Sequence, residues 1–188
     1  MSVHAGLLTV EEFLKLPEPK EGHLELHHGE AVVMPPPKKG HQKIQDRIQM
    51  LLKRLVGQKG VVRMEMAFRP TPEYEVWQAD VGYVSLERDE ATGDDEYLMG
   101  APELVVEVLS PGRANERRDR EVKLKLYSRR AVEEYWIADW RLRQIDVYRR
   151  ANLALQLVTT LHESDNLETP LLPGFSCLIA TLFDKLPS

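Results

Sequence analysis

The chain has 188 residues, of which 43% are hydrophobic and 29% are charged, and its formal net charge is -5. This length fits one domain with a substantial core. The composition excludes a disordered, fibrous or membrane-spanning protein, because no apolar run approaches the roughly 18 residues of a membrane helix. The acidic total argues against a protein that coats nucleic acid, and the single cysteine, Cys177, excludes an intrachain disulfide or a cysteine-based zinc site. We expect a cytoplasmic protein without a signal peptide, because the N-terminus lacks a basic patch followed by an apolar core.

The first 40 residues predict a short helix and a hairpin. Thr9-Val-Glu-Glu12 has the form of a capping box, so we expect a helix that runs to about Leu16. Two apolar segments, 23–27 and 31–34, flank a turn at His28-Gly29-Glu30 and are typical of a β-hairpin.

The middle of the chain predicts one long helix and three strands. From residue 41 to 57, apolar side chains recur at helical spacing, which is the most regular helical pattern in the sequence. Strands are expected at 61–69, 77–86 and 103–110. In the first strand, alternation places Met64, Met66 and Phe68 on one face. The acidic residues at 87–90 and 94–96 predict a loop between the second and third strands.

The last third of the chain predicts a basic helix followed by further strands. The helix runs from Glu116 to about Arg130, with Val122, Leu126 and Tyr127 as its buried line. Strands are expected at 135–138, 144–148 and 155–161, before a mixed apolar segment at 171–186. The order predicts one α/β domain with a mixed central sheet covered on both faces. Its parts are a helix and hairpin (1–40), an α/β core (41–150) and C-terminal strands with a tail (151–188).

One charged residue, Glu107, interrupts the apolar strand in ELVVEVLSPG, residues 103–112. A buried carboxylate is costly unless something compensates it. Glu107 therefore pairs with a neighbouring basic residue, faces water on an edge strand, or takes part in chemistry. The preceding strand also carries a single acid, Asp80. If the two strands pair, their carboxylates lie within a few ångströms, and their repulsion favours a cation between them, for which Mg²⁺ is suited.

Lys123 lies on the basic helix that follows Glu107. Asp119, Lys123 and Tyr127 are spaced i, i+4 and i+8 and share one stripe of that helix. A lysine that points from this stripe toward the sheet would orient a nucleophilic water and offset the charge on a phosphate. The alternative is an ordinary solvated face of a charged helix.

Together these residues resemble the PD-(D/E)xK nuclease superfamily, and the wider pattern is similar to one branch, the Uma-two family of restriction endonuclease-like proteins. The resemblance covers most of the chain and is most specific between residues 100 and 139. It rests on the segments HLELHHGEAVVMPPP, ADV at 79–81, GAPELVVEVLSPG, RRDREVKLKLY, VEEYWIAD and LLPGFSCLIATLF.

The resemblance implies a restriction-endonuclease-like core and a set of site residues. Asp80 and Glu107 would hold Mg²⁺ or Mn²⁺, with the Val108 carbonyl as a backbone ligand. Lys123 would assist catalysis, because Leu109 stands where the superfamily expects a lysine and the Uma-two pattern carries one on the next helix. Glu25 of the hairpin would complete the site, with Glu30 as its rival. A further departure, Ala79 in place of a proline, affects a position that does no chemistry.

The function implied is metal-dependent hydrolysis of DNA phosphodiester bonds. Phosphate contacts would come from basic residues at the start of the helix after Glu107, namely Arg113, Arg117, Arg118 and Arg120. For each arginine, a purely solubilising role is the alternative. A catalytically inactive nuclease-fold binding or structural protein is the competing function, and an enzyme of other phosphate-containing substrates is a third. Cleavage of both strands of a duplex calls for two sites, so a homodimer is expected by analogy.

Overall fold

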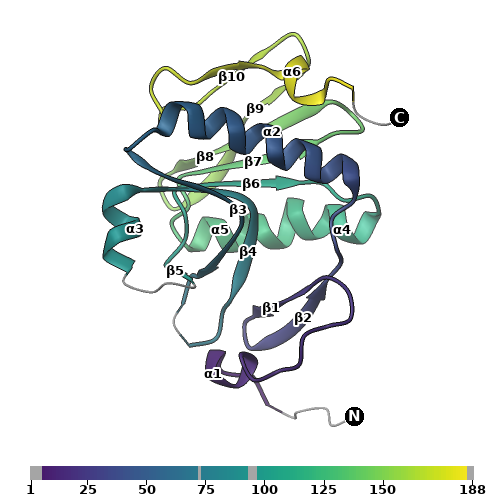
Figure 1. Cartoon of the computed structure of the whole chain (residues 1–188), viewed down its shortest axis with the longest axis vertical. Helices are drawn as coiled ribbons and strands as arrows, with labels where there is room; N and C mark the ends of the chain where they lie inside the picture. Colours follow the sequence, from purple (N-terminus) through teal and green to yellow (C-terminus); the bar gives the residue numbers. More distant parts are fainter. Residues whose placement is uncertain (1–5, 72, 93–96, 186–188) are drawn as a thin grey trace.

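The computed structural model describes residues 6–71, 73–92 and 97–185 and is built around a mixed β-sheet (Figure 1). Within these residues the sheet has seven strands in the order β5-β3-β4-β6-β7-β8-β9. The strands are β3 (Gly60–Arg69), β4 (Trp77–Ser85), β5 (Leu98–Met99), β6 (Leu104–Val108), β7 (Glu134–Asp139), β8 (Gln144–Ala151) and β9 (Ala154–Leu161). Parallel pairs β3–β5 and β6–β7 combine with antiparallel neighbours, which confirms the predicted mixed α/β class.

Helices cover both faces of the sheet, as Figure 1 shows. On one face lies α2 (Lys39–Val56), whose residues Ile44, Ile48 and Leu52 are buried in a core cluster with the C-terminal helix α6 (Ile179–Phe183). The opposite face is covered by a helical segment that links the parallel strands β6 and β7. It consists of α4 (Arg113–Arg117), the π-helical turn η1 (Arg118–Lys123) and α5 (Leu124–Arg129).

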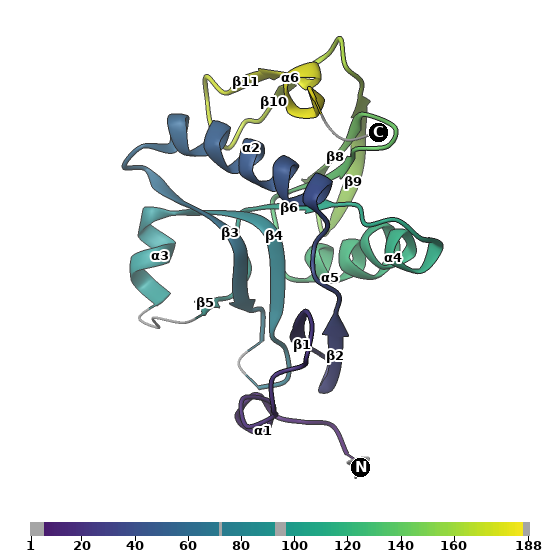
Figure 2. The same cartoon turned by 45° about the vertical axis from the view of Figure 1, so that its right-hand side comes forward.

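The N-terminal elements lie at one end of the molecule and the C-terminal elements at the other (Figure 2). The helix α1 (Val10–Phe13) begins with the predicted capping box and is shorter than expected. The predicted hairpin is formed by β1 (His23–His27) and β2 (Glu30–Met34), and Leu26 joins it to Val76 through two backbone hydrogen bonds of 2.8 and 3.0 Å. Beyond the sheet, β10 (Asn166–Glu168) pairs with β11 (Ser176–Leu178).

The segment after residue 150 takes part in the same core. Strand β9 extends the central sheet to Leu161, and α6 packs in the cluster under α2. In the part of the chain that the structure describes, no helix is both long and apolar enough to cross a membrane.

The basic helix has a different buried face from the predicted one. Leu126 and Tyr127 are buried as expected, whereas Val122 is 47% exposed. Asp119 and Lys123 take the inward positions instead. Asp119, Lys123 and Tyr127 thus form the i, i+4, i+8 stripe of the helix that faces the sheet, and Val122 lies beside this stripe.

The predicted acidic loop is also partly wrong. Residues 86–92 form α3 (Leu86–Thr92), because this segment is rich in good helix formers and carries acids in its first turn, where they favour the helix dipole. The second acidic group, 94–96, lies outside the described residues.

Strands β3 and β4 change face where Glu65 lies opposite Asp80. Strict alternation would place Ala79 and Val81 on one side, yet Ala79 packs in the cluster under α5 and Val81 in the cluster under α2. The backbone of Glu65 has a positive φ of 49°, and both strands curve strongly (Figure 1). The same irregularity leaves Met64 37% exposed, which corrects its predicted place beside Met66.

Candidate active site

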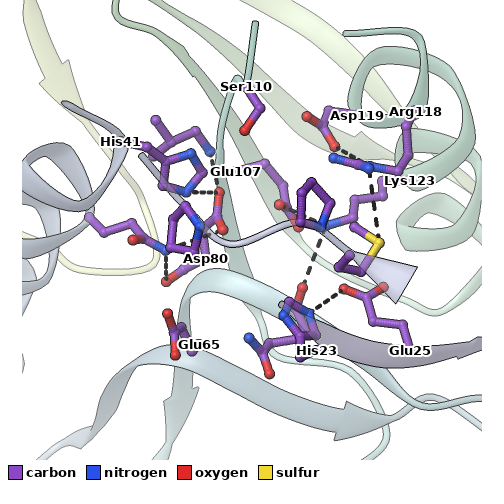
Figure 3. Close-up of a pocket in the computed structure, with 16 residues that line it drawn as sticks. His23, Glu25, His41, Glu65, Asp80, Glu107, Ser110, Arg118, Asp119 and Lys123 are labelled. Carbon is purple, nitrogen blue, oxygen red and sulfur yellow. Dashed lines mark hydrogen bonds and ion pairs between the residues drawn. The ribbon is translucent and has the colours of Figure 1, made fainter. Parts of the chain in front are cut away.

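A pocket lies among the hairpin, the start of α2, strands β4 and β6, and the π-helical turn, and Figure 3 shows its lining side chains. It brings together every residue predicted for catalysis or metal binding. These are Glu25, Asp80, Glu107, Val108 and Lys123.

Asp80 and Glu107 meet because β4 and β6 run antiparallel. Val81 lies opposite Val106, so Asp80 and Glu107 form the next pair in the register. Regular pairing ends there, and the side chain of Asp80 takes the place of a strand partner: its Oδ2 accepts the N–H of Val108 at 2.6 Å. The two acids therefore reach the pocket from facing positions on two neighbouring strands.

Two residues of α2 also contact the Asp80 carboxylate. Gln45 Nε2 donates to Asp80 Oδ1 at 3.2 Å, and His41 Nε2 lies 3.1 Å from Oδ2. Burial tends to raise the pKa of Asp80, but the contact with His41, the charge of Lys123 and the Val108 N–H outweigh it and lower the pKa. Asp80 is therefore an anion at neutral pH.

Glu107 is 2% exposed and both of its oxygens have partners. The hydroxyl of Tyr127 donates to Oε1 at 2.5 Å, and Lys123 Nζ lies 2.8 Å from Oε2. Burial raises the pKa of Glu107 well above its usual value; the Lys123 charge opposes this rise and the Asp80 charge adds to it. The edge-strand interpretation is wrong, since β6 lies inside the sheet, whereas pairing with a basic residue does occur, through Lys123 itself.

Lys123 is buried among carboxylates and does not belong to a solvated face. It is 3% exposed, and its Nζ also lies 3.5 Å from the Gln78 carbonyl oxygen. Burial tends to lower the pKa of Lys123, but the charges of the surrounding acids outweigh burial and raise it, so the side chain remains an ammonium. These acids, in order of effect, are Glu107, Glu25, Asp119 and Asp80.

Glu25 reaches the pocket from the hairpin and is 1% exposed. His27 Nε2 lies 2.6 Å from one carboxylate oxygen of Glu25, and His23 Nε2 lies 3.2 Å from the other. The His27 ring stacks on the Trp77 ring, with the ring centroids 3.7 Å apart. Burial tends to raise the pKa of Glu25, but the Lys123 charge and the two histidines lower it to about 2. The rival Glu30 is exposed in the hairpin and does not line the pocket.

The four predicted DNA-binding arginines occupy different environments. Arg118 lines the pocket, where its Nε lies 3.4 Å from Asp119 Oδ1. Arg120 forms ion pairs with Asp146 and with Asp139. The other two, Arg113 and Arg117, are exposed on α4, and Arg117 pairs with Glu121 at 3.1 Å.

Several residues that line the pocket were not assigned to the site from the sequence, and Asp119, His41 and Gln45 are among them. Asp119 was seen only as part of a helical stripe, and it is 2% exposed beside Lys123. His41 and Gln45 were not assigned to the site, although both are buried. The sequence did contain a sign of their burial, because both polar residues lie on the apolar face of α2 together with Ile44 and Ile48.

Comparisons with known proteins show the family of the chain and a similar fold. The model of the Uma2 family, described as "Putative restriction endonuclease", matches residues 10–181. The chain belongs to this family. Among solved structures, it is similar to the crystal structure of a putative nuclease belonging to DUF820 from Anabaena variabilis ATCC 29413, with a TM-score of 0.73 and 19% identity over 94% of this chain and 97% of that chain. A search of curated proteins finds no match.

The side chains of this Uma2 family member suit a hard divalent cation. The pocket offers carboxylate oxygens, which Mg²⁺ and Mn²⁺ prefer, and no cysteine. Within residues 6–71, 73–92 and 97–185, no group of three or more His, Cys, Asp or Glu side chains is placed so that it could hold a metal ion. Mg²⁺ needs no such group, because it typically binds one or two carboxylates and keeps several waters.

Proposed function

We propose that the protein is a divalent-metal-dependent endonuclease that hydrolyses DNA phosphodiester bonds. The observation that carries this proposal is the charge of the pocket: the carboxylates of Glu25, Asp80, Glu107 and Asp119 surround one buried ammonium, that of Lys123. Burial and repulsion by the Asp80 charge raise the pKa values of Glu107 and Asp119, and a further cation would relieve this repulsion. Membership of a family of restriction endonuclease-like proteins supports a nuclease.

Mg²⁺ or Mn²⁺ would be held by the carboxylates of Asp80 and Glu107 and by the Val108 carbonyl. When bound, such an ion activates water and stabilises the negative charge that develops on the phosphate. Asp80 suits this role because its low pKa keeps it ionised.

The remaining residues would position substrate and water. Lys123 stays charged in its acidic surroundings, so it can donate a hydrogen bond to the attacking water or to a phosphate oxygen. Glu25, ionised at neutral pH, keeps this ammonium charged and accepts hydrogen bonds within the pocket. Arg118 lines the same pocket and can contact the phosphate, and Arg113 and Arg117 would hold the DNA backbone outside it.

The proposal is tested by titrating Mn²⁺ into the protein in a calorimeter and by following cleavage of mixed single- and double-stranded DNA. We expect the wild type to bind Mn²⁺ and to cleave, and Asp80→Asn, Glu107→Gln and Lys123→Met to cleave at least ~100-fold more slowly. Glu30→Gln, which removes an exposed carboxylate of the same hairpin, is the control and should cleave normally.

Two outcomes would contradict the proposal. A folded wild type that neither binds Mn²⁺ nor cleaves DNA would favour a non-catalytic member of the fold. Cleavage that survives all three substitutions would place the reaction elsewhere.

A further inference from the structure

The two oxygens of Glu107 are held by different side chains of the helix that covers the sheet. Tyr127 donates to Oε1 at 2.5 Å and Lys123 Nζ lies 2.8 Å from Oε2. Lys123 lines the pocket, whereas Tyr127 does not. The oxygen held by Tyr127 is therefore on the core side of the carboxylate, and the oxygen beside Lys123 is on the pocket side.

The Tyr127 hydroxyl has little freedom to move. Its side chain is 0% exposed, and its ring contacts three aromatic rings, those of Phe68, Trp77 and Tyr135, with centroid separations of 6.2, 6.5 and 5.0 Å. The guanidinium of Arg150 also donates to the Tyr127 carbonyl oxygen at 3.2 Å. A close-packed aromatic cluster of this kind holds side chains in single rotamers.

The same aromatic cluster extends to the carboxylate of Glu25, which lies in the pocket but comes from the hairpin and not from the sheet. Trp77 packs edge-on against Tyr127 on one side and stacks on His27 on the other. His27 in turn contacts Glu25 at 2.6 Å. One set of packed rings thus connects Glu25, on the hairpin, with Glu107, on β6.

We infer that Tyr127 is a positioning residue of the site: its hydroxyl holds Oε1 of Glu107, so that the carboxylate presents Oε2 to the pocket. This inference rests on the proposed function, in which that oxygen would bind the divalent cation. A free glutamate rotates about its last side-chain bond, and the hydrogen bond removes this freedom. Partners that orient metal ligands typically contribute 10- to 100-fold in metal affinity or activity.

The test compares Tyr127→Phe with Tyr135→Phe. Both changes keep a buried ring of the same cluster and remove one hydroxyl, but Tyr135 donates to the Asp119 backbone carbonyl and not to Glu107. Calorimetric titration with Mn²⁺ should show ~10- to 100-fold weaker binding for Tyr127→Phe. Tyr135→Phe should bind within about 2-fold of the wild type.

A second comparison separates positioning from general loosening of the core. Because Tyr127 acts through Glu107, adding Tyr127→Phe to a Glu107→Gln protein should change Mn²⁺ affinity by less than about 2-fold. Near-ultraviolet circular dichroism, which reports on packed aromatic rings, shows whether each variant keeps the native cluster. In active protein, the DNA KM should stay unchanged while the Mn²⁺ concentration for half-maximal cleavage rises.

The outcomes distinguish this inference from the proposed function. If the wild type binds Mn²⁺ and Tyr127→Phe binds equally well, the positioning role is overturned and the proposed function stands. Equal losses in Tyr127→Phe and Tyr135→Phe would also overturn it, because they would indicate loosening of the cluster. If the wild type binds no Mn²⁺, both the proposed function and the positioning role fall.

Discussion

At the residue scale, the pocket is an arrangement of mutually compensated buried charges. Glu107 is tolerated inside an apolar strand because Lys123 and Tyr127 satisfy both of its oxygens. Lys123 is tolerated because acids surround it. Burial of each charge therefore depends on the others, and removal of one partner leaves an uncompensated charge.

Glu25 gives a pH prediction. Its pKa falls from 4.5 to about 2 on folding, so the folded state binds the proton less tightly than the unfolded state. The contribution of ionised Glu25 to the free energy of unfolding is fully present above pH 4.5 and is lost as the pH falls toward 2. This contribution is at most about 3 kcal/mol. We expect the free energy of unfolding, measured in urea, to fall less steeply over this range in Glu25→Gln than in the wild type. Parallel curves for the two proteins would contradict this expectation, and Glu30→Gln serves as the control.

At the element scale, the π-helical turn η1 carries the two buried charged side chains of the basic helix. It places Asp119 and Lys123 inward and leaves Val122 outward, whereas Leu126 on α5 returns to the core. Val122 lies beside the buried stripe of Asp119, Lys123 and Tyr127 and not in it. Single π-helical turns inside helices are frequent at functional sites.

The exposure of Val122 is testable by stability. Val122→Ala should change the free energy of unfolding by about 0.5 kcal/mol or less, because the side chain is 47% exposed. Leu126→Ala removes a side chain that is 3% exposed and should cost ~2–5 kcal/mol. Urea denaturation of both variants measures the difference, and a large loss for Val122→Ala would mean that the Val122 side chain is buried.

At the scale of the whole molecule, an acidic chain carries a local basic surface. The net charge is -5, yet the segment that follows β6 begins with exposed arginines on α4. Arg113 and Arg117 are exposed there, and Arg117 has one exposed partner, Glu121, whereas Arg120 is less exposed and is paired with two buried acids, Asp146 and Asp139. We therefore expect the four arginines to contribute unequally to DNA binding.

The salt dependence of DNA binding checks this expectation. Removal of one arginine that binds a phosphate should lower the slope of log affinity against log salt by ~0.9, so Arg113→Ala with Arg117→Ala should lower it by ~2. Arg143→Ala is the matched control: Arg143 is also paired at the surface, with Glu163 at 2.5 Å, and lies on the turn after β7. An unchanged slope in the double variant would assign DNA binding to another surface.

The sequence predicted the hairpin, the long helix α2, six strands of the central sheet and the two acids. Alternating and helical apolar periodicity located these elements, because burial of one face imposes such periods wherever the backbone is regular. The short strands β5, β10 and β11 and the helix α3 were not predicted. The single acids Asp80 and Glu107 were visible because each interrupts an apolar strand. Family motifs then indicated Lys123 and Glu25, which local patterns alone left open.

The tertiary structure decided which polar side chains meet around those acids. The change of face at Glu65 and Asp80, and the π-helical turn that ends at Lys123, are irregularities that periodicity cannot predict. The contacts of His41 and Tyr127 with the two acids join residues 39 and 20 positions apart in the chain. Such pairings depend on how the sheet curves and how helices pack across it, which no local stretch of sequence encodes.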